Sequence, residues 1–328
     1  MNRIAYFDFL RGLAIIMVCG IHTWHITDFD SLQGIMSILL RQILNCAVPL
    51  FFSISGYFLQ QKIFEKKVDV FSFWKSQIPK VYIPALIWSL PWLCLNILNG
   101  GNVAKSIITY CICGFSIYYF IAVIIQYYIL LPFLLNVNRF LMTVLSSLIS
   151  GISIMFIIYL TQIEGIKLPL IVYAGHGDLW LVFFVLGIYL RYSSYNYSWK
   201  LPLLFAILFL VLQMGESYFL YKYNEGGFGI KLSSFIFSVS VILLLFHSSI
   251  VKHYSEKYVF VEWIRKIGRF SFGIYLIHCF FITLISHTEF KDSFWLIRWF
   301  LSISLSIIVI FISKKCLSPK INYYLGFY

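Results

Sequence analysis

The fold is decided by the stretch Tyr6-Phe-Asp8-Phe-Leu-Arg11-Gly-Leu-Ala-Ile-Ile-Met-Val-Cys-Gly-Ile-His22. It is mostly apolar and, at 1.5 Å per residue, long enough to cross most of a hydrocarbon layer of about 30 Å. Placing an ionisable group inside such a helix costs at least about 2.5 to 3.5 kcal/mol of insertion free energy. Asp8, Arg11 and His22 therefore each need a partner, a water-filled cavity or a functional role. The stretch predicts a membrane helix that carries a polar stripe.

Apolar runs of similar length recur along the whole chain. Apolar residues make up 61% of the 328 positions and charged residues only 12%, against roughly 45–50% and 25% in ordinary globular proteins. The alternating pattern of a membrane β-barrel is absent. We therefore expect an all-α, polytopic integral membrane helical bundle of about ten helices, with spans near residues 7–27, 36–60, 81–98, 116–135, 141–161, 178–190, 201–220, 230–250, 268–287 and 294–313.

The distribution of charge predicts orientation. Ten spans place both termini on one side, and assigning that side to the cytoplasm puts most of the 25 Lys and Arg inside, as the positive-inside rule requires. The net charge of +12 is spread along the chain, which argues against a nucleic-acid partner. We expect a multi-pass protein of the inner (plasma) membrane, in contact with membrane lipid.

The chain is expected to form a single transmembrane domain over residues 1–328. The longest polar interruptions, Gln61–Lys80 and Lys252–Arg269, mix charged and aromatic residues and are interpreted as cytoplasmic interfacial segments. The first apolar stretch lacks the features of a cleavable signal peptide. The seven Cys match no usual metal or redox spacing, so no bound metal or cofactor is expected.

The polar stripe of the first helix is the leading candidate site. His22 follows Arg11 by eleven positions, which is three turns plus about 20°, so both side chains share one face about 16 Å apart along the axis. Asp8 can pair with Arg11 one turn away. His suits general-base work near neutral pH. The alternatives are that Arg11 snorkels at a helix end and that His22 makes a helix–helix hydrogen bond; His25 reads better as an interfacial residue.

Two later helices carry further polar residues. In the second span, Ser53 and Ser55 precede Gly56 and Tyr57; hydroxyls at these positions can line a cavity, although close helix packing also explains them. In the ninth span, Tyr275 and His278 share a face of a helix that is otherwise apolar. For this pair, packing and a site are equally good interpretations.

Four segments together resemble the membrane acyltransferase-3 family. Asp8-Phe-Leu-Arg11, with ten residues between Arg11 and His22, resembles the first helix of that family, which carries an Arg and a His at this spacing. Later helices of the family are resembled by Phe51-Phe-Ser-Ile-Ser-Gly56-Tyr, by Tyr118-Tyr-Phe-Ile-Ala-Val-Ile-Ile-Gln-Tyr-Tyr-Ile-Leu-Leu-Pro132 and by Gly268-Arg-Phe-Ser-Phe-Gly-Ile-Tyr275-Leu-Ile-His278. The match runs in order over nearly the whole chain.

The resemblance implies transfer of an acetyl or succinyl group from cytoplasmic acyl-CoA, acetyl-CoA above all, to a hydroxyl of a cell-surface glycan or lipid-linked sugar. It implies His22 as the group that activates the acceptor and Arg11, held by Asp8, as a donor or oxyanion partner. Lys80, Lys75 and Arg269 become candidates for binding coenzyme A phosphates. One position departs from the family: where it often has two Arg three residues apart, this chain has Gln77 and Lys80, and Lys is a point charge without the bidentate fork of Arg.

Two other classes of function stay open at this point. A transporter or exporter of a polysaccharide or lipid-linked sugar would use the same polar cavity without consuming acyl-CoA. A structural subunit of an envelope polysaccharide assembly would use the polar stripe only to join helices. Intramembrane polar residues alone support an enzyme and a transporter about equally. The resemblance favours the enzyme.

Overall fold

The computed structural model describes residues 5–25, 28–64, 69–192, 198–224, 227–247, 258–288 and 294–328. Regular structure within these residues is entirely helical. The helices are α1 (Ala5–Thr23), α2 (Leu32–Leu44), α3 (Ala47–Phe64), α4 (Val70–Leu98), α5 (Val103–Cys111), η1 (Ser116–Tyr118), α6 (Tyr119–Leu134), α7 (Arg139–Ile158), η2 (Tyr159–Ile163), α8 (Leu170–Ala174), α9 (Gly177–Tyr192), α10 (Lys200–Asn224), α11 (Leu232–Leu245), α13 (Val259–Arg269), α14 (Ser271–Ile285), α15 (Trp295–Cys316) and α16 (Pro319–Tyr324). The expected all-α class is confirmed.

Length and hydropathy identify the membrane spans. Among the described residues, eight helical segments are long and apolar enough to cross a membrane, and the bent pair α13–α14 makes a ninth. The expected span at 230–250 corresponds to α11, which has only 14 residues. The chain is therefore a multi-pass membrane protein, with α11 shorter than a bilayer-spanning helix needs to be.

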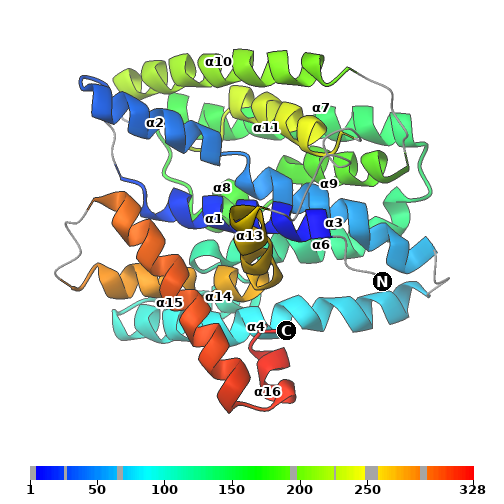
Figure 1. The fold of residues 1–328 in the computed structure, drawn as a ribbon, viewed down its shortest axis with the longest axis vertical. Helices are drawn as coiled ribbons and strands as arrows, with labels where there is room; N and C mark the ends of the chain where they lie inside the picture. The colour runs from blue at the N-terminus through cyan, green and yellow to red at the C-terminus, as the bar shows by residue number, and fades with distance from the viewer. Residues whose placement is uncertain are drawn as a thin grey trace.

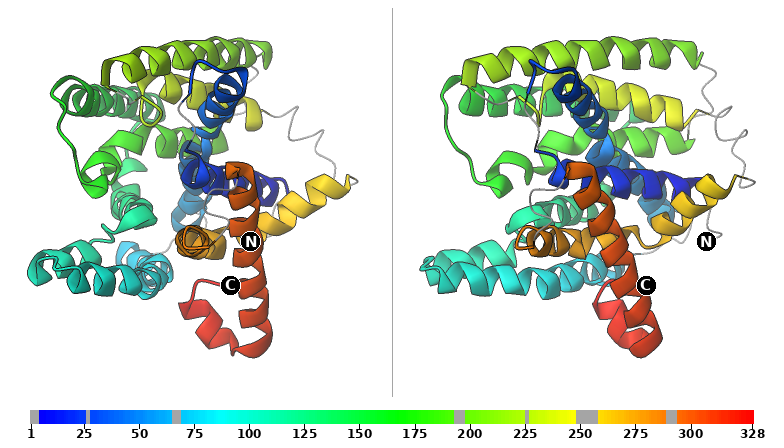
Figure 2. Two further views of the ribbon diagram at one scale, coloured as in Figure 1. Left: turned by 90° about the vertical axis from the view of Figure 1, so that its left-hand side faces the viewer. Right: turned by 60° about the vertical axis from the view of Figure 1, so that its left-hand side comes forward.

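Most of the long helices run alongside one another in a broad, layered bundle. In Figure 1, α10, α7, α9, α3, α1 and α4 follow similar directions from one edge of the molecule to the other, while α15 crosses them at a steep angle. The views in Figure 1 and Figure 2 place α4 and α10 on opposite sides of α1, with α16 beyond α4. Helix α1 lies between them and packs against α13, α3, α14 and α15.

Helix α1 reaches the centre because two glycines let α13 come close to it. A Cβ on Gly12 would lie 2.0 Å from the backbone oxygen of Ile264, and a Cβ on Gly268 would lie 1.7 Å from that of Asp8. Only hydrogen fits at either position, since real Cβ contacts are far longer. The close approach fixes the turn of α1 that contains Asp8 against the end of α13. Arg269, the last residue of α13, directly follows Gly268 there.

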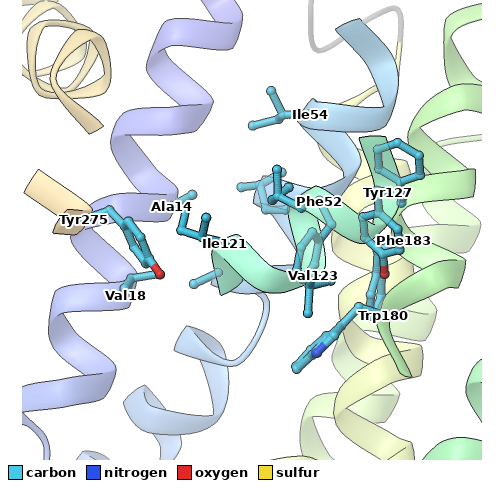
Figure 3. Packing of buried hydrophobic residues seen from close by; sticks show 14 of the residues in the cluster. Ala14, Val18, Phe52, Ile54, Ile121, Val123, Tyr127, Trp180, Phe183 and Tyr275 are labelled. Carbon is cyan, nitrogen blue, oxygen red and sulfur yellow. The ribbon is translucent and has the colours of Figure 1, made fainter. Parts of the chain in front are cut away.

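An aromatic core fixes α3, α6 and α9 beside this assembly. Figure 3 shows Phe52 beside Tyr127 and Phe183, with Trp180 next to them. The rings of Tyr127 and Phe184 stack at 4.4 Å, and the Tyr127 hydroxyl donates to the Gly177 carbonyl at 2.7 Å. Stacked rings with satisfied hydroxyls make a rigid wall, so this region forms a fixed frame for the helices around it.

Two boundaries differ from the sequence interpretation. The span predicted from residue 268 begins at Ser271, because the chain bends by 82° between α13 and α14. The charged segment before it is helical from Val259, and its residues 252–257 lie outside the described residues. Of the predicted interfacial segment Gln61–Lys80, residues 61–64 end α3 and residues 70–80 begin α4, a 29-residue helix, while residues 65–68 lie outside the described residues. Asp69 caps α4 by accepting from the Ser72 amide.

Candidate active site

Arg11 and His22 line one cavity inside the bundle. Its volume is about 270 Å³, and its wall is completed by α3, α6 and α14 and by the last residue of the chain. Its other polar side chains are those of Ser55, Tyr119, Tyr128, Ser271, Tyr275 and Tyr328, and the rest of the lining is Phe, Ile and Val. The helix is regular from Ala5 to Thr23, so the spacing of eleven residues keeps the two groups about 16 Å apart along its axis. The cavity therefore offers two different functional ends.

At the first end, a buried carboxylate holds two guanidinium groups. Asp8 is 1% exposed and accepts from Nη1 of Arg11 at 3.0 Å, while Nε of Arg269 lies 3.9 Å from its second oxygen. The Arg11 guanidinium also lies over the Phe58 ring at 5.2 Å. Two guanidinium groups thus converge on one carboxylate, and paired guanidinium groups suit a polyanionic ligand.

At the second end, His22 faces the buried His278. Their ring centroids are 5.4 Å apart. Nδ1 of His278 lies 2.8 Å from the Tyr275 carbonyl and 3.1 Å from that of Ile274, so in the neutral ring Nδ1 carries the hydrogen, because carbonyls only accept. Nε2 of His278 is then an acceptor, 3.5 Å from Sγ of Cys279.

His22, His278 and Cys279 also form a donor set that could hold a metal ion. One ligand atom from each lies within 4.8 Å of the others, and two imidazoles with one thiolate suit Zn²⁺ chemically. The Cys279 thiol would have to lose its proton, and a metal would take the His22 lone pair that a general base needs. The prediction of a metal-free site stays a prediction.

The cavity beside Arg11 and His22 is one of three in a row. A cavity of about 250 Å³ shares Arg11, Ser271, Phe272 and Tyr328 with it and is also lined by Arg269. On the other side, a cavity of about 180 Å³ shares His22, Val48 and Tyr119 with it. His22 is exposed although it lies within the bundle, because open space borders it on both sides. It stands at the junction of two cavities.

The far cavity contains Arg41, which the sequence interpretation missed. Arg41 lies near the end of α2 and is 8% exposed. It was identifiable in principle, because it is a charged residue within the apolar span predicted at 36–60 and such residues demand an explanation. No spacing rule links it to Arg11 or His22, since it belongs to another helix.

The remaining predicted cavity residues divide into two groups. Ser55 and Tyr275 line the cavity of Arg11 and His22. Ser53 instead donates to the Phe183 carbonyl at 2.9 Å and joins α3 to α9. Tyr57 accepts from Arg191 at 3.2 Å, and His25 pairs with Arg298 at the exposed end of α1. These last three contribute packing or surface contacts and do not line the three cavities described above.

Neither of the two predicted lysines lines the cavities described. Lys75 is exposed on the first turns of α4. Lys80 is half-buried, and its carbonyl accepts from the hydroxyl of Tyr328 at 3.5 Å, a residue that lines both cavities next to Arg11. Arg269 is the one of the three predicted donor-binding cations that lines any of the cavities described.

Comparison with known families gives a match over nearly the whole chain. Residues 4–314 match the family described as an acyltransferase domain. This range includes the polar stripe of α1, the bend between α13 and α14 and the whole of the Arg41 cavity.

Similarity to individual proteins is weaker. Proteins named probable poly-beta-1,6-N-acetyl-D-glucosamine export protein from Staphylococcus aureus strains Mu50 and MRSA252 are 25% and 26% identical, over 92% of this chain and 88% of theirs. No solved structure is significantly similar. The name of the family refers to acyl transfer, and the names of these relatives refer to export of a polysaccharide.

Proposed function

This chain belongs to the membrane acyltransferase-3 family, and from that premise we propose that it is an integral membrane O-acyltransferase. It moves an acetyl or succinyl group from cytoplasmic acyl-CoA to a hydroxyl of a cell-surface glycan or lipid-linked sugar, in the inner membrane. The observation that carries the proposal is the single cavity with a cationic end at Arg11 and an imidazole, His22, at the other.

The cationic end receives the donor. Arg11 and Arg269 share Asp8, and both line the adjoining cavity of about 250 Å³. Guanidinium groups bind pyrophosphate oxygens well. A separation of about 16 Å between Arg11 and His22 is too long for both to touch the reacting carbonyl. Arg11 therefore acts on the coenzyme phosphates, and the extended pantetheine arm carries the thioester along the cavity to His22.

The imidazole end performs the transfer. His22 takes the proton of the acceptor hydroxyl as that oxygen attacks the thioester carbonyl, forming the new C–O bond. The tetrahedral intermediate then breaks its C–S bond, and the imidazolium returns the proton to the departing thiolate of coenzyme A. Atoms and charge balance without a further reactant. His278 supports the step by packing beside His22, with ring centroids 5.4 Å apart, so that it restricts the positions that the His22 ring can take.

The acceptor approaches from the far cavity. His22 borders that space as well, so donor and acceptor meet at one residue from opposite sides. Tyr119, Tyr173 and Trp180 line the far cavity and offer aromatic faces to a sugar ring. The names of the Staphylococcus aureus relatives refer to a polymer of N-acetyl-D-glucosamine, which supports a glycan acceptor here.

A second candidate function is export of a polysaccharide or lipid-linked sugar without acyl transfer. The three cavities in a row favour it, as do the names of the relatives. The two functions differ in whether a thioester is consumed. An exporter moves glycan across a sealed vesicle and leaves acetyl-CoA intact.

Purified protein in lipid nanodiscs tests the proposal directly. With acetyl-CoA and an N-acetylglucosamine oligosaccharide, we expect release of free coenzyme A thiol together with a mass gain of one acetyl group on the sugar. His22→Ala abolishes both signals while the protein stays monodisperse. Full thioester cleavage and sugar acetylation by His22→Ala would refute the assigned role of His22, and sugar transport by wild-type protein without thioester loss would favour export.

A further inference from the structure

The cavity beyond His22 contains a buried guanidinium that pairs with none of the described carboxylates. Arg41 lines this space of about 180 Å³ together with residues of α3, α6, α8, α9 and α11. Its side-chain acceptor is the amide oxygen of Asn45, and the Trp24 ring lies 5.8 Å from its guanidinium carbon. Among the residues that the structure describes, no carboxylate lies within ion-pairing distance of Arg41.

This arrangement is costly for the apo protein. A guanidinium has five N–H donors, and a buried cation needs a counter-charge or dense hydrogen bonding to offset the loss of water. One amide oxygen and one aromatic face supply little of that. Because the guanidinium borders open cavity space, a ligand can supply the missing acceptors.

The neighbouring cation does not relieve Arg41. Lys231 is completely buried next to Gln42, and its amine donates to the side chain of Gln42, to Ser217 at 2.5 Å and to the Gly227 carbonyl at 2.9 Å, all of them neutral acceptors. Glu216, the nearby acid, accepts from Ser233. Lys231 therefore brings no negative charge to the guanidinium of Arg41.

The position of Arg41 is rigid. Lys231 holds Gln42, Trp24 donates to Ser37 at 2.9 Å, and Ser31 caps the start of α2 by accepting from the Gly34 amide. Fixed donors bind an oxyanion with less loss of entropy than mobile ones. The guanidinium is thus preorganised at a fixed place in the cavity that also borders His22.

We propose that Arg41 binds a carboxylate or phosphate of the substrate in the far cavity, so that the enzyme selects a substrate with an anion close to the reacting hydroxyl or acyl carbon. The proposal rests on the transferase function above and names its substrate class. The anion has two possible sources, which share one chemistry: an acidic substituent of the acceptor sugar, or the terminal carboxylate of a succinyl group already brought to His22.

Four substrate pairs distinguish the two sources. Acetyl-CoA and succinyl-CoA are each combined with a neutral N-acetylglucosamine oligosaccharide and with one of the same length that carries a glucuronate unit. We expect the wild-type protein to prefer an anionic substrate, and Arg41→Gln to lower kcat/KM for that substrate by about tenfold to a hundredfold, as loss of a buried charged contact does. The one pair with no carboxylate on the acyl group or the sugar, acetyl-CoA with the neutral oligosaccharide, should change by about twofold or less.

The pattern of loss identifies the source of the anion. A loss that follows succinyl-CoA with either acceptor assigns the anion to the acyl group, and a loss that follows glucuronate with either donor assigns it to the sugar. Arg41→Lys keeps the charge and should retain the preference at lower affinity. The matched control is Arg191→Gln, since Arg191 contacts Tyr57 away from the cavities, and it should leave all four pairs unchanged.

A binding measurement makes the test independent of turnover. Succinate and inorganic phosphate should raise the unfolding temperature of the wild-type protein and of His22→Ala, and should fail to do so for Arg41→Gln. Equal loss for all four substrate pairs, or equal anion stabilisation of wild-type protein and Arg41→Gln, would overturn the proposal. If wild-type protein binds anions through Arg41 but transfers no acyl group, the anion site stands and the transferase function fails.

Discussion

Arg11 and Arg41 are two guanidinium groups in one row of cavities, and they differ in what balances their charge. Arg11 is half-buried and paired with Asp8 at 3.0 Å, and Arg269 shares the same carboxylate. Arg41 is more deeply buried and has an amide and an indole instead. A resident carboxylate orients a cation but competes with a ligand, whereas a neutral shell leaves the charge available. The Arg11 end therefore suits a polyanion that engages two cations, and the Arg41 end suits a single small anion.

Replacing the residue between the two ends should have the largest effect. His22→Ala removes the imidazole that borders both substrate cavities, and general-base catalysis contributes about 10²- to 10⁴-fold. We expect kcat to fall by that factor with little change in KM for either substrate. Steady-state kinetics in nanodiscs measure it. Intact kcat would show that the two cavities do not meet at a reacting centre.

Replacing Arg11 should weaken donor binding and leave the acceptor side alone. We expect Arg11→Gln to raise KM for acetyl-CoA by about tenfold, the worth of roughly one charge-assisted contact, with KM for the sugar unchanged. Arg41→Gln should instead leave the KM for acetyl-CoA unchanged, because an acetyl group has no carboxylate for Arg41 to bind. If both variants raise the same KM, the division of the cavities between donor and acceptor is wrong.

Replacing Asp8 should affect stability as well as donor binding. Asp8→Asn leaves Arg11 and Arg269 without their shared counter-charge, and loss of a buried charged partner costs about 1 to 3 kcal/mol. The free energy of unfolding should fall by that amount, measured by denaturant titration in detergent. Asp69→Asn, which changes a carboxylate that caps exposed helix α4, is the matched control and should cost less.

The smallest effect is expected from replacing the lysines of α4. Lys75 is exposed on α4, where water and salt screen its charge, so Lys75→Gln should change the KM for acetyl-CoA by less than about twofold. Lys80→Gln should have the larger effect of the two, because Lys80 neighbours Tyr328 at the cavity wall. A larger effect of Lys75→Gln would place the coenzyme farther out than the Arg11 end.

Much of the fold follows from local rules. Apolar runs of sufficient length specify membrane helices wherever they occur, which is why α1, α6, α7, α10 and α15 lie where the sequence predicts them. The bend after Arg269 and the shortness of α11 were not predictable in this way. Both depend on contacts with neighbouring helices, and the hydropathy of a segment does not show where its helix bends or ends.

The sequence by itself determined that the chain spans a membrane and that Arg11 and His22 share a face of α1, because helical periodicity fixes the relation between residues of one helix. Tertiary structure alone decided that His278 faces His22, that Ser53 packs against α9 and that Arg41 enters the cavity beyond His22. These relations join residues of different helices. They depend on how the helices pack against one another, which no spacing within a single helix encodes.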